Sequence, residues 1–179
     1  MSATHFDEAE NHQHPLPTPI RGAVITVSDR CAAGAREDAS GPLAAELLRV
    51  HGINVAQVAV VPDGVESVRQ AIQAAVDDGA RVVLTTGGTG ITPRDLTPEG
   101  TAPLLALRLE GIEAQIRAYG LNQTPRAALS RGLVGVTNRE ADGTLVVNAP
   151  GSCGGVKDTV AVVGPLVAHI LEQLAGGDH

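Results

Sequence analysis

Aromatic side chains are almost absent from this chain of 179 residues. It has no tryptophan, and Phe6 and Tyr119 are its only phenylalanine and tyrosine. Proteins that bind single-stranded nucleic acid usually stack the bases on such rings, and the net charge of -7 opposes binding to a phosphate backbone over a broad face. The sequence therefore excludes a general nucleic-acid binder. A small anionic ligand remains compatible with it, because local loops can bind an anion without net positive charge.

Cysteines and long apolar runs are also scarce. Cys31 and Cys153 are too few for a disulfide scaffold and are not spaced as a metal knuckle, so we expect reduced thiols. The first twenty residues contain acids, histidines and prolines instead of a basic start followed by an apolar stretch. No run approaches the roughly 20 apolar residues that a membrane helix needs. We therefore expect a cytoplasmic protein with no membrane segment.

The first nineteen residues differ in composition from the rest of the chain. They combine several acids with "HQHPLPTP" and contain few β-branched residues, so they bury too little apolar surface to offset the entropy lost on ordering. We predict a disordered tail over 1–19 and one domain over 20–179. His12 and His14 could be offered as metal ligands, but no second pair of ligands lies near them, and solvated histidines are the expected state.

From Gly22 onward, short apolar runs alternate with helical patterns. "AVITVSDR" predicts a strand, and the spacing of Leu43, Leu47 and Leu48 after it predicts a helix. "INVAQVAVVPDG" and "VESVRQAIQAAVDDGA" repeat this unit. "RVVLTTGGTG" begins a third unit with the β-branched run expected of a strand that is buried on both faces. Such repeats imply right-handed crossovers, so the fold class is α/β with an open, mostly parallel sheet.

The C-terminal half predicts further helices and one hairpin. Helical spacing runs through "EGTAPLLALRLEGIEAQIRAYGL", with an expected break at Gly111 and another at Thr124–Pro125. "GLVGVTNREADGTLVVNAPG" indicates an antiparallel hairpin that turns at Asp142–Gly143. Apolar residues return at helical spacing over 156–174, where Pro165 should kink or restart the helix.

Ligands of open parallel sheets bind beyond the carboxyl ends of the strands, and the unusual loops of this chain lie at those ends. The densest signal is "TTGGTGITPRDLTPEG", whose glycines let backbone N–H groups approach a phosphate or pyrophosphate closely. We expect four such loops to converge on one crevice, namely Ser28–Asp29–Arg30, Pro62–Asp63–Gly64, Thr86–Gly90 and Asn148–Ser152.

The residues after the glycines strengthen the prediction of a phosphate site. "GGTG" fits neither the Walker pattern nor the dinucleotide fingerprint, and alone it would indicate only a flexible connection. Arg94 and Asp95 add a cation and a carboxylate, and Thr97 is expected to cap the following helix. Asp63 and Asp95 could face one Mg²⁺ ion, which proteins usually hold with one or two carboxylates and substrate phosphates. From spacing alone, a plain turn residue in Pro–Asp–Gly is the better explanation of Asp63.

These motifs resemble those of a known family. "SDRCAAGAREDASGP", "VVPDG", "TTGGTGITPRDLTPE", "TPRAALSR" and "VNAPGS" are similar to motifs of the molybdopterin-binding Mog/MoaB family of molybdenum-cofactor biosynthesis, which is related to the G domain of gephyrin. The resemblance extends from about Gly22 to about Leu174. It implies a three-layer α/β/α sandwich, usually assembled as a homotrimer, with the molybdenum-insertion protein as a candidate partner.

The resemblance also implies an activity. Catalytic members of the family are molybdopterin adenylyltransferases, which use Mg²⁺ as cofactor and ATP and molybdopterin as substrates, attach AMP to the pterin's terminal phosphate and release pyrophosphate. It places the two catalytic, Mg²⁺-binding carboxylates at Asp63 and Asp95. The other binding residues that it implies are Ser28, Asp29, Gly87, Gly88, Thr89, Gly90, Arg94, Ser130, Asn148, Pro150, Gly151 and Ser152.

Two alternatives to the enzyme stay open. One is a non-catalytic MoaB-type protein that binds the pterin in the same pocket, and the other is an interaction module of the gephyrin kind. The last loop also departs from the family pattern, because Cys153 stands where proline is usual and Gly154 where lysine is usual. If that lysine binds phosphate in other members, Lys157 or an arginine such as Arg36 would have to substitute for it, or binding would be weaker.

Overall fold

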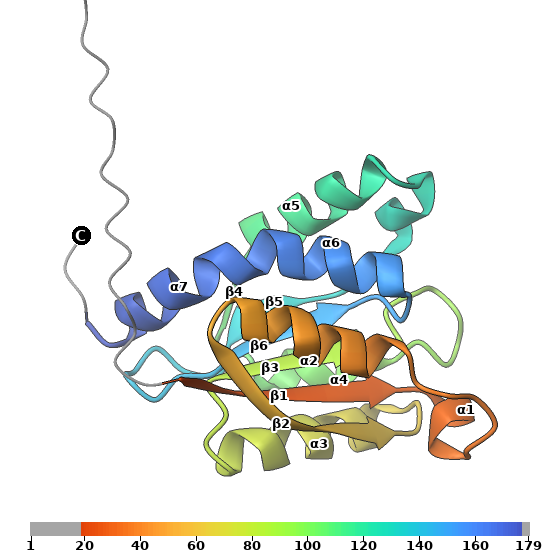
Figure 1. Cartoon of the computed structure of the whole chain (residues 1–179), viewed down its shortest axis with the longest axis horizontal. Helices are drawn as coiled ribbons and strands as arrows, with labels where there is room; N and C mark the ends of the chain where they lie inside the picture. The colour runs from red at the N-terminus through yellow and green to blue at the C-terminus, as the bar shows by residue number, and fades with distance from the viewer. Residues whose placement is uncertain (1–18, 177–179) are drawn as a thin grey trace, which may run out of the picture.

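The structure is a computed structural model, and it describes residues 19–176. These residues form a six-stranded sheet in the order β2–β1–β3–β6–β5–β4, with helices on both faces (Figure 1). The predicted α/β/α sandwich is therefore confirmed. The predicted tail, apart from Pro19, lies outside the described residues.

Three parallel pairings build the centre of the sheet. β1 (Ile20–Val27) lies between β2 (Ile53–Val61) and β3 (Val82–Thr86), and β3 pairs on its other side with β6 (Leu145–Ala149). Every residue of β3 and of β6 is buried, as the continuous β-branched run predicts. β3 thus has a hydrogen-bonded neighbour on each edge and a helical layer over each face.

An antiparallel hairpin extends the sheet beyond β6. β5 (Val134–Val136) pairs with β6, as predicted, and also with the short strand β4 (Leu107–Arg108). The predicted break at Gly111 is wrong, because the helical path is interrupted earlier, where the backbone pairs with β5 instead. α5 (Glu110–Leu121) then runs through Gly111 without a break, since one glycine costs a helix only about 1 kcal/mol.

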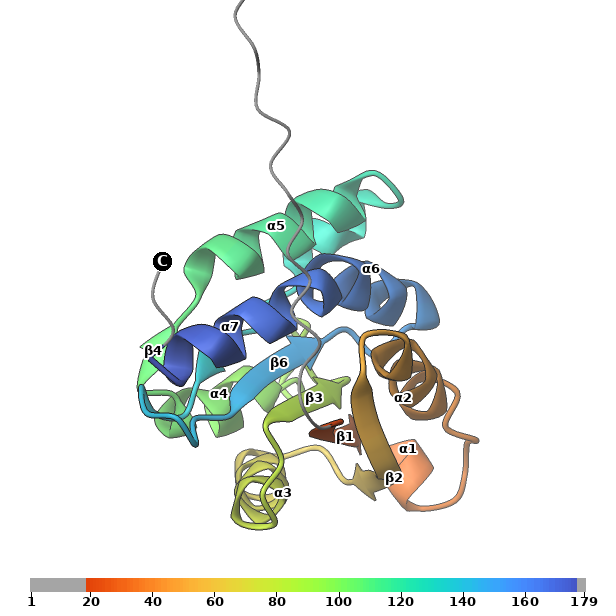
Figure 2. The same ribbon diagram turned by 60° about the vertical axis from the view of Figure 1, so that its left-hand side comes forward.

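The helices divide between the two faces (Figure 2). α2 (Ser40–Val50), α5, α6 (Cys153–Val163) and α7 (Val167–Leu174) cover the larger apolar cluster. α3 (Val65–Asp77) and α4 (Thr97–Thr101) cover the opposite face and its smaller cluster. The remaining short elements are α1 (Asp29–Ala32), η1 (Ala102–Leu104), η2 (Pro125–Leu129) and η3 (Gly164–Leu166).

The last apolar stretch, Cys153–Leu174, is a core element of the domain. By length and composition alone it could cross a membrane, but 44% of its most apolar window is buried inside the molecule. α6 and α7 pack on the sheet, and the 3₁₀ turn η3 separates them. Pro165 lies in that turn and the α-helix restarts at Val167, so the prediction that Pro165 would kink or restart the helix is confirmed.

One buried carboxylate joins α5 to the hairpin. Glu113 is 2% exposed, and its oxygens accept hydrogen bonds from Arg108 Nε, Arg108 Nη2 and Val134 N. Burial alone would raise the pKa of Glu113, but these hydrogen bonds outweigh it and hold the pKa below its ordinary value of 4.5. The ion pair thus fixes α5 relative to β4 and β5.

Glu113→Gln is expected to lower the free energy of unfolding by about 1–2 kcal/mol at neutral pH, because the neutral amide loses the charged hydrogen bonds from Arg108. A lowered native pKa adds stability only above the pKa of the unfolded chain. The difference between wild type and variant should therefore shrink as pH falls below 4.5. Urea unfolding across this range checks both points. Glu110→Gln, whose exposed carboxylate lies 3.9 Å from Arg108, is the control, and a difference that does not change with pH would contradict the prediction.

Candidate functional site

The loop after β3 has a backbone conformation that favours glycine. Gly87 and Gly88 have φ values of 103° and 64°, in a region that other residues rarely adopt. A Cβ atom at Gly87 would overlap the carbonyl oxygen of Val27, and one at Gly88 would overlap Thr97 Oγ1. The fold of the loop itself therefore requires these two glycines.

The four carbonyl oxygens of residues 87–90 all accept hydrogen bonds from the protein. Thr97 supplies the first two donors, with its Oγ1 at 2.9 Å from Gly87 O and its N at 3.0 Å from Gly88 O. Arg131 supplies the other two, through its backbone N and its Nε. In a trans peptide, C=O and the following N–H point in opposite directions. The N–H groups of residues 88–91 therefore point away from these donors.

Those four N–H groups form a candidate anion site. Within residues 19–176, no protein atom accepts a hydrogen bond from them. Successive backbone N–H groups without protein acceptors make a concave site that favours negative charge. The prediction that Thr97 caps α4 is wrong: the helix begins at Thr97, the cap position is Leu96, and the threonine hydroxyl binds the glycine loop instead.

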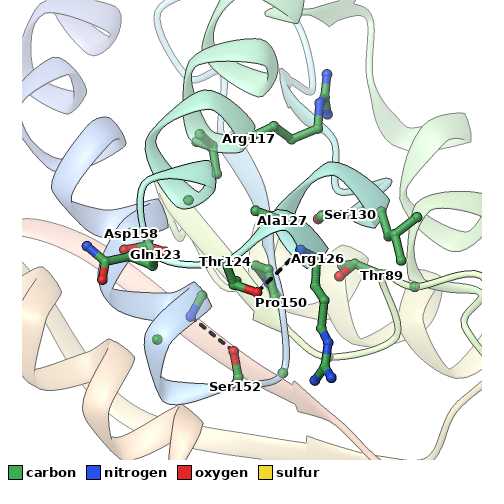
Figure 3. Close-up of a pocket in the computed structure, with 18 of the residues that line it drawn as sticks. Thr89, Arg117, Gln123, Thr124, Arg126, Ala127, Ser130, Pro150, Ser152 and Asp158 are labelled. Atoms are coloured by element: carbon green, nitrogen blue, oxygen red, sulfur yellow. Dashed lines mark hydrogen bonds between the residues drawn. The ribbon is translucent and has the colours of Figure 1, made fainter.

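The glycine loop lines a cavity of about 460 Å³ (Figure 3). The opposite walls come from the second half of α5, from η2, and from the loop between β6 and α6 together with the first turn of α6. Nine of the predicted site residues line this cavity, namely Gly87, Gly88, Thr89, Gly90, Asp95, Ser130, Pro150, Gly151 and Ser152.

A second, smaller cavity of about 290 Å³ adjoins the first, because Gly151 and Ser152 line both. Its walls include Ser28 and both cysteines, together with Arg36 and Asp38. The predicted crevice thus corresponds to two adjoining cavities. The loops after β1, β3 and β6 border two cavities, and the loop after β2 lines neither of them.

The two predicted catalytic aspartates occupy different surroundings. Asp95 lines the larger cavity, and its Oδ2 accepts a hydrogen bond from Thr92 N at 2.8 Å. Asp63 lies outside both cavity linings and pairs instead with Asp29, each carboxylate accepting from the other residue's backbone N at 3.0 Å. Arg94, which is 74% exposed, donates to Asp29 Oδ2. The structure thus brings Asp29, Asp63 and Arg94 together at the end of β1, and none of the three lines either cavity.

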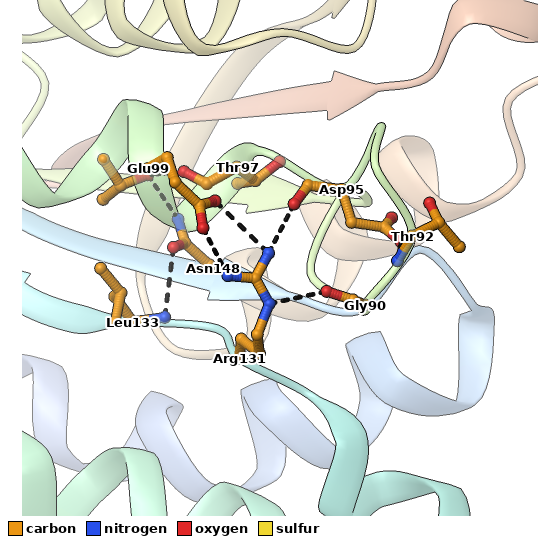
Figure 4. A network of polar contacts seen from close by, with 9 residues as sticks. Gly90, Thr92, Asp95, Thr97, Glu99, Arg131, Leu133 and Asn148 are labelled. Atoms are coloured by element: carbon orange, nitrogen blue, oxygen red, sulfur yellow. Dashed lines mark hydrogen bonds and ion pairs between the residues drawn. The ribbon is translucent and has the colours of Figure 1, made fainter.

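Asn148 was predicted in the ligand pocket, but it lies in the core. It is 2% exposed, and its Oδ1 accepts from Leu133 N (Figure 4). Its Nδ2 donates to Thr85 Oγ1 and Thr101 Oγ1. A buried amide with these three partners is satisfied by the protein. Asn148 therefore joins β6 to β3, to α4 and to the residue before β5, and it does not line either cavity.

Several cavity residues were missed by the sequence reasoning. Arg117, Gln123, Thr124, Arg126 and Asp158 all line the larger cavity. In Figure 3, Arg126 extends from η2 past Pro150, whereas Arg117 points to the opposite side. The predicted break at Thr124–Pro125 could have indicated that this segment forms a wall of the cavity, because a break between helices often marks a loop that can bind a ligand.

The residues that depart from the family pattern in the last loop, and those suggested to substitute for its lysine, lie at different places. Gly154 lines the larger cavity, whereas Lys157 lines neither, and Arg36 lines only the smaller one. Cys31 and Cys153 are free thiols, as expected. Within residues 19–176, no three histidine, cysteine, aspartate or glutamate side chains come together as a metal site.

Solved structures share this fold. A MogA structure superimposes with a TM-score of 0.81 at 42% identity, over 87% of this chain and 99% of that chain. The tungsten cofactor synthesizing protein MoaB from Pyrococcus furiosus has a TM-score of 0.81 at 37% identity, over 88% of this chain and 98% of that chain. The molybdopterin adenylyltransferase of Pyrococcus furiosus is 39% identical over 92% of this chain and 96% of its own length.

Other relatives are longer proteins. The molybdenum cofactor biosynthesis bifunctional protein of Synechococcus elongatus is 40% identical over 89% of this chain but only 49% of its own length. For the gephyrin of Dictyostelium discoideum, the matched share of its own length is 21%. This chain thus spans half or less of these relatives.

Residues 23–169 match the family described as a probable molybdopterin binding domain. The fold and this match thus define a member of the molybdopterin-binding domain family. The chain belongs to the MogA/MoaB family of molybdenum-cofactor biosynthesis, which is related to gephyrin.

Gly87→Ala is expected to destabilise the protein by about 1–3 kcal/mol, because the positive φ and the overlap with Val27 O strain the new side chain. Thermal or urea unfolding measures this loss. Gly111→Ala in α5 is the matched control, since its Cβ would meet no atom within 4 Å and alanine is the better helix former. Equal stability of the two variants would contradict the assigned loop conformation.

Proposed function

We propose that the chain is a Mg²⁺- and ATP-dependent molybdopterin adenylyltransferase of the cytoplasm, which transfers AMP from ATP to molybdopterin and releases pyrophosphate. The observation that carries the proposal is the row of N–H groups over residues 88–91, which has no acceptor among residues 19–176 and lies in the loop after β3 at a large cavity. Phosphates are the ligands for which such a row is suited. The adenylyltransferase relative, matched over nearly its whole length, supports the same activity.

The residues of the cavity fit a magnesium ion as part of this proposal. Asp95 Oδ1 accepts no hydrogen bond within the described residues, and the glycine loop lies beside it, so a cation held there would also contact phosphate oxygens. Asp63 also has an oxygen, Oδ1, without a donor in this part of the chain. We assign the first carboxylate to Asp95 and the second to Asp63, which would have to turn from Asp29 toward the ligand. When bound, Mg²⁺ supplies charge neutralisation for the phosphates.

The chain's own groups would do the rest by positioning and electrostatics. The loop N–H groups bind the phosphate oxygens on which charge develops, and they are already oriented before the substrate arrives, so little reorganisation is needed. The cavity holds the attacking pterin phosphate against the α-phosphorus of ATP. Arg126 adds positive charge along the wall opposite the glycine loop. Ser130, Pro150 and Gly151 shape the remaining walls.

A second candidate is a non-catalytic, MoaB-type pterin-binding protein. It is favoured by the equal TM-scores of the MogA structure and of the tungsten-cofactor MoaB structure. It also agrees with the location of Asp63 outside the cavity linings. Both candidates would bind molybdopterin, and a homotrimer and contact with the molybdenum-insertion protein belong to either proposal.

Molybdopterin incubated with the protein, ATP and Mg²⁺ is expected to gain one AMP, which a mass measurement detects, with release of an equal amount of pyrophosphate. Asp95→Asn should lower kcat by about a hundredfold or more, because it removes a charge at the reacting phosphates. The control is Asp77→Asn, in an exposed carboxylate on α3. Binding of the pterin without any AMP transfer would favour the second candidate, and full activity of Asp95→Asn would overturn the assignment of Asp95.

A further inference from the structure

Arg131 lies immediately behind the glycine loop. Its neighbour Ser130 lines the larger cavity, but Arg131 itself does not. In Figure 4 its guanidinium points under the loop, toward Gly90, Asp95 and Glu99. Nε donates to Gly90 O at 2.7 Å, Nη2 to Asp95 O at 2.5 Å, and Nη1 to Glu99 Oε1 at 2.5 Å.

All three guanidinium nitrogens are therefore engaged by the protein. The backbone N of Arg131 also donates to Thr89 O at 2.8 Å. Arg131 thus binds the carbonyl oxygens of three peptide groups, those of Thr89, Gly90 and Asp95. The N–H of each of these peptide groups, which belongs to the next residue, points to the opposite side. Two of those N–H groups, at Gly90 and Ile91, belong to the candidate anion site, and Asp95 is the proposed catalytic carboxylate.

Glu99 holds the guanidinium in this orientation. It comes from the first turn of α4 and receives hydrogen bonds from Nη1 and Nη2 of Arg131. The hydrogen bond from Arg131 lowers the pKa of Glu99, and Glu99 in turn raises the pKa of Arg131. Both groups thus stay charged at neutral pH, and the pair connects α4 to the segment that follows η2.

We propose that Arg131, held by Glu99, is a positioning residue that orients the peptide groups of the glycine loop for binding an anion and does not bind the anion itself. The proposal rests on the proposed function only in taking substrate phosphate as the anion. Arginine suits this position because a planar fork with several donors can bind two carbonyl oxygens and a carboxylate at once, which a lysine ammonium cannot do.

The rival explanation is that Arg131 attracts the phosphate directly by its charge. The two explanations predict opposite signs for one variant. Glu99→Gln removes a negative charge near the site, so a purely electrostatic role for Arg131 predicts tighter binding of an anion. A positioning role predicts weaker binding, because the guanidinium loses its charged partner and the loop loses its fixed orientation.

The experiment measures the affinity for Mg²⁺–ATP by titration calorimetry, together with the ¹⁵N order parameters of Gly90 and Ile91 in the protein without ligand. Arg131→Lys and Glu99→Gln are each expected to weaken ATP binding by about tenfold, the equivalent of one or two lost hydrogen bonds. The order parameters should fall toward the flexible range, below about 0.6. Circular dichroism identifies any variant that is unfolded.

The matched controls are Arg69→Lys and Glu66→Gln, which alter an exposed Arg–Glu pair on α3. They should change neither measurement. Tighter ATP binding by Glu99→Gln, or unchanged order parameters in both site variants, would overturn the positioning role. If the wild-type protein binds no ATP, the proposed function fails, whereas the order parameters still test the inference because they need no ligand.

Discussion

Burial of β3 on both faces is the constraint on which the site depends. A strand between two layers of helices has no water to satisfy its polar groups, so the last two threonines must find partners inside the protein. Thr85 Oγ1 accepts from Asn148, and Thr86 Oγ1 donates to Pro150 O. These bonds tie the end of β3 to the end of β6 and bring the two loops of the larger cavity together.

The same constraint continues into the glycine loop. As the chain leaves β3, each carbonyl oxygen of residues 87–90 is bound by Thr97 or Arg131 on the protein side, so the N–H groups are left for a ligand. This arrangement explains how a chain with net charge -7 and almost no aromatic rings could bind the anionic pterin and the nucleotide of the proposed reaction. Their recognition would depend on backbone dipoles, hydroxyls and aliphatic walls, and it would need few positively charged side chains.

The sequence predicted those features that depend on neighbouring residues. The alternating strands and helices, the hairpin at Asp142–Gly143 and the kink at Pro165 all follow from periodicity and from local turn chemistry. Eight of the nine predicted residues that line the larger cavity do so because they lie in the loops that follow β3 and β6, whereas Ser130 follows η2.

The features that the sequence did not predict depend on partners far away in the chain. Asn148 is a plausible pocket residue until its bonds to Thr85 and Thr101 are known, and nothing in the spacing of the sequence indicates that Asp63 pairs with Asp29. The strand β4 has only two residues, too few for a recognisable sequence pattern, and it forms because its backbone pairs with the edge of β5. Arg131 follows Ser130 in the sequence, and spacing gives no reason to orient its side chain toward Glu99.

The strand order also determines when the site can form. β6 is the last strand in the sequence, yet it lies between β3 and β5 in the sheet. Until residues 145–149 have joined, β3 keeps one edge without hydrogen bonds, and the loop from β6 to α6 cannot close the cavity. During synthesis the first two strand–helix units can pair locally, whereas the ligand site must wait for contacts that span more than sixty residues, such as Thr86 to Pro150 with a separation of 64. Ligand binding therefore requires that the C-terminal part of the domain has already folded onto the N-terminal part.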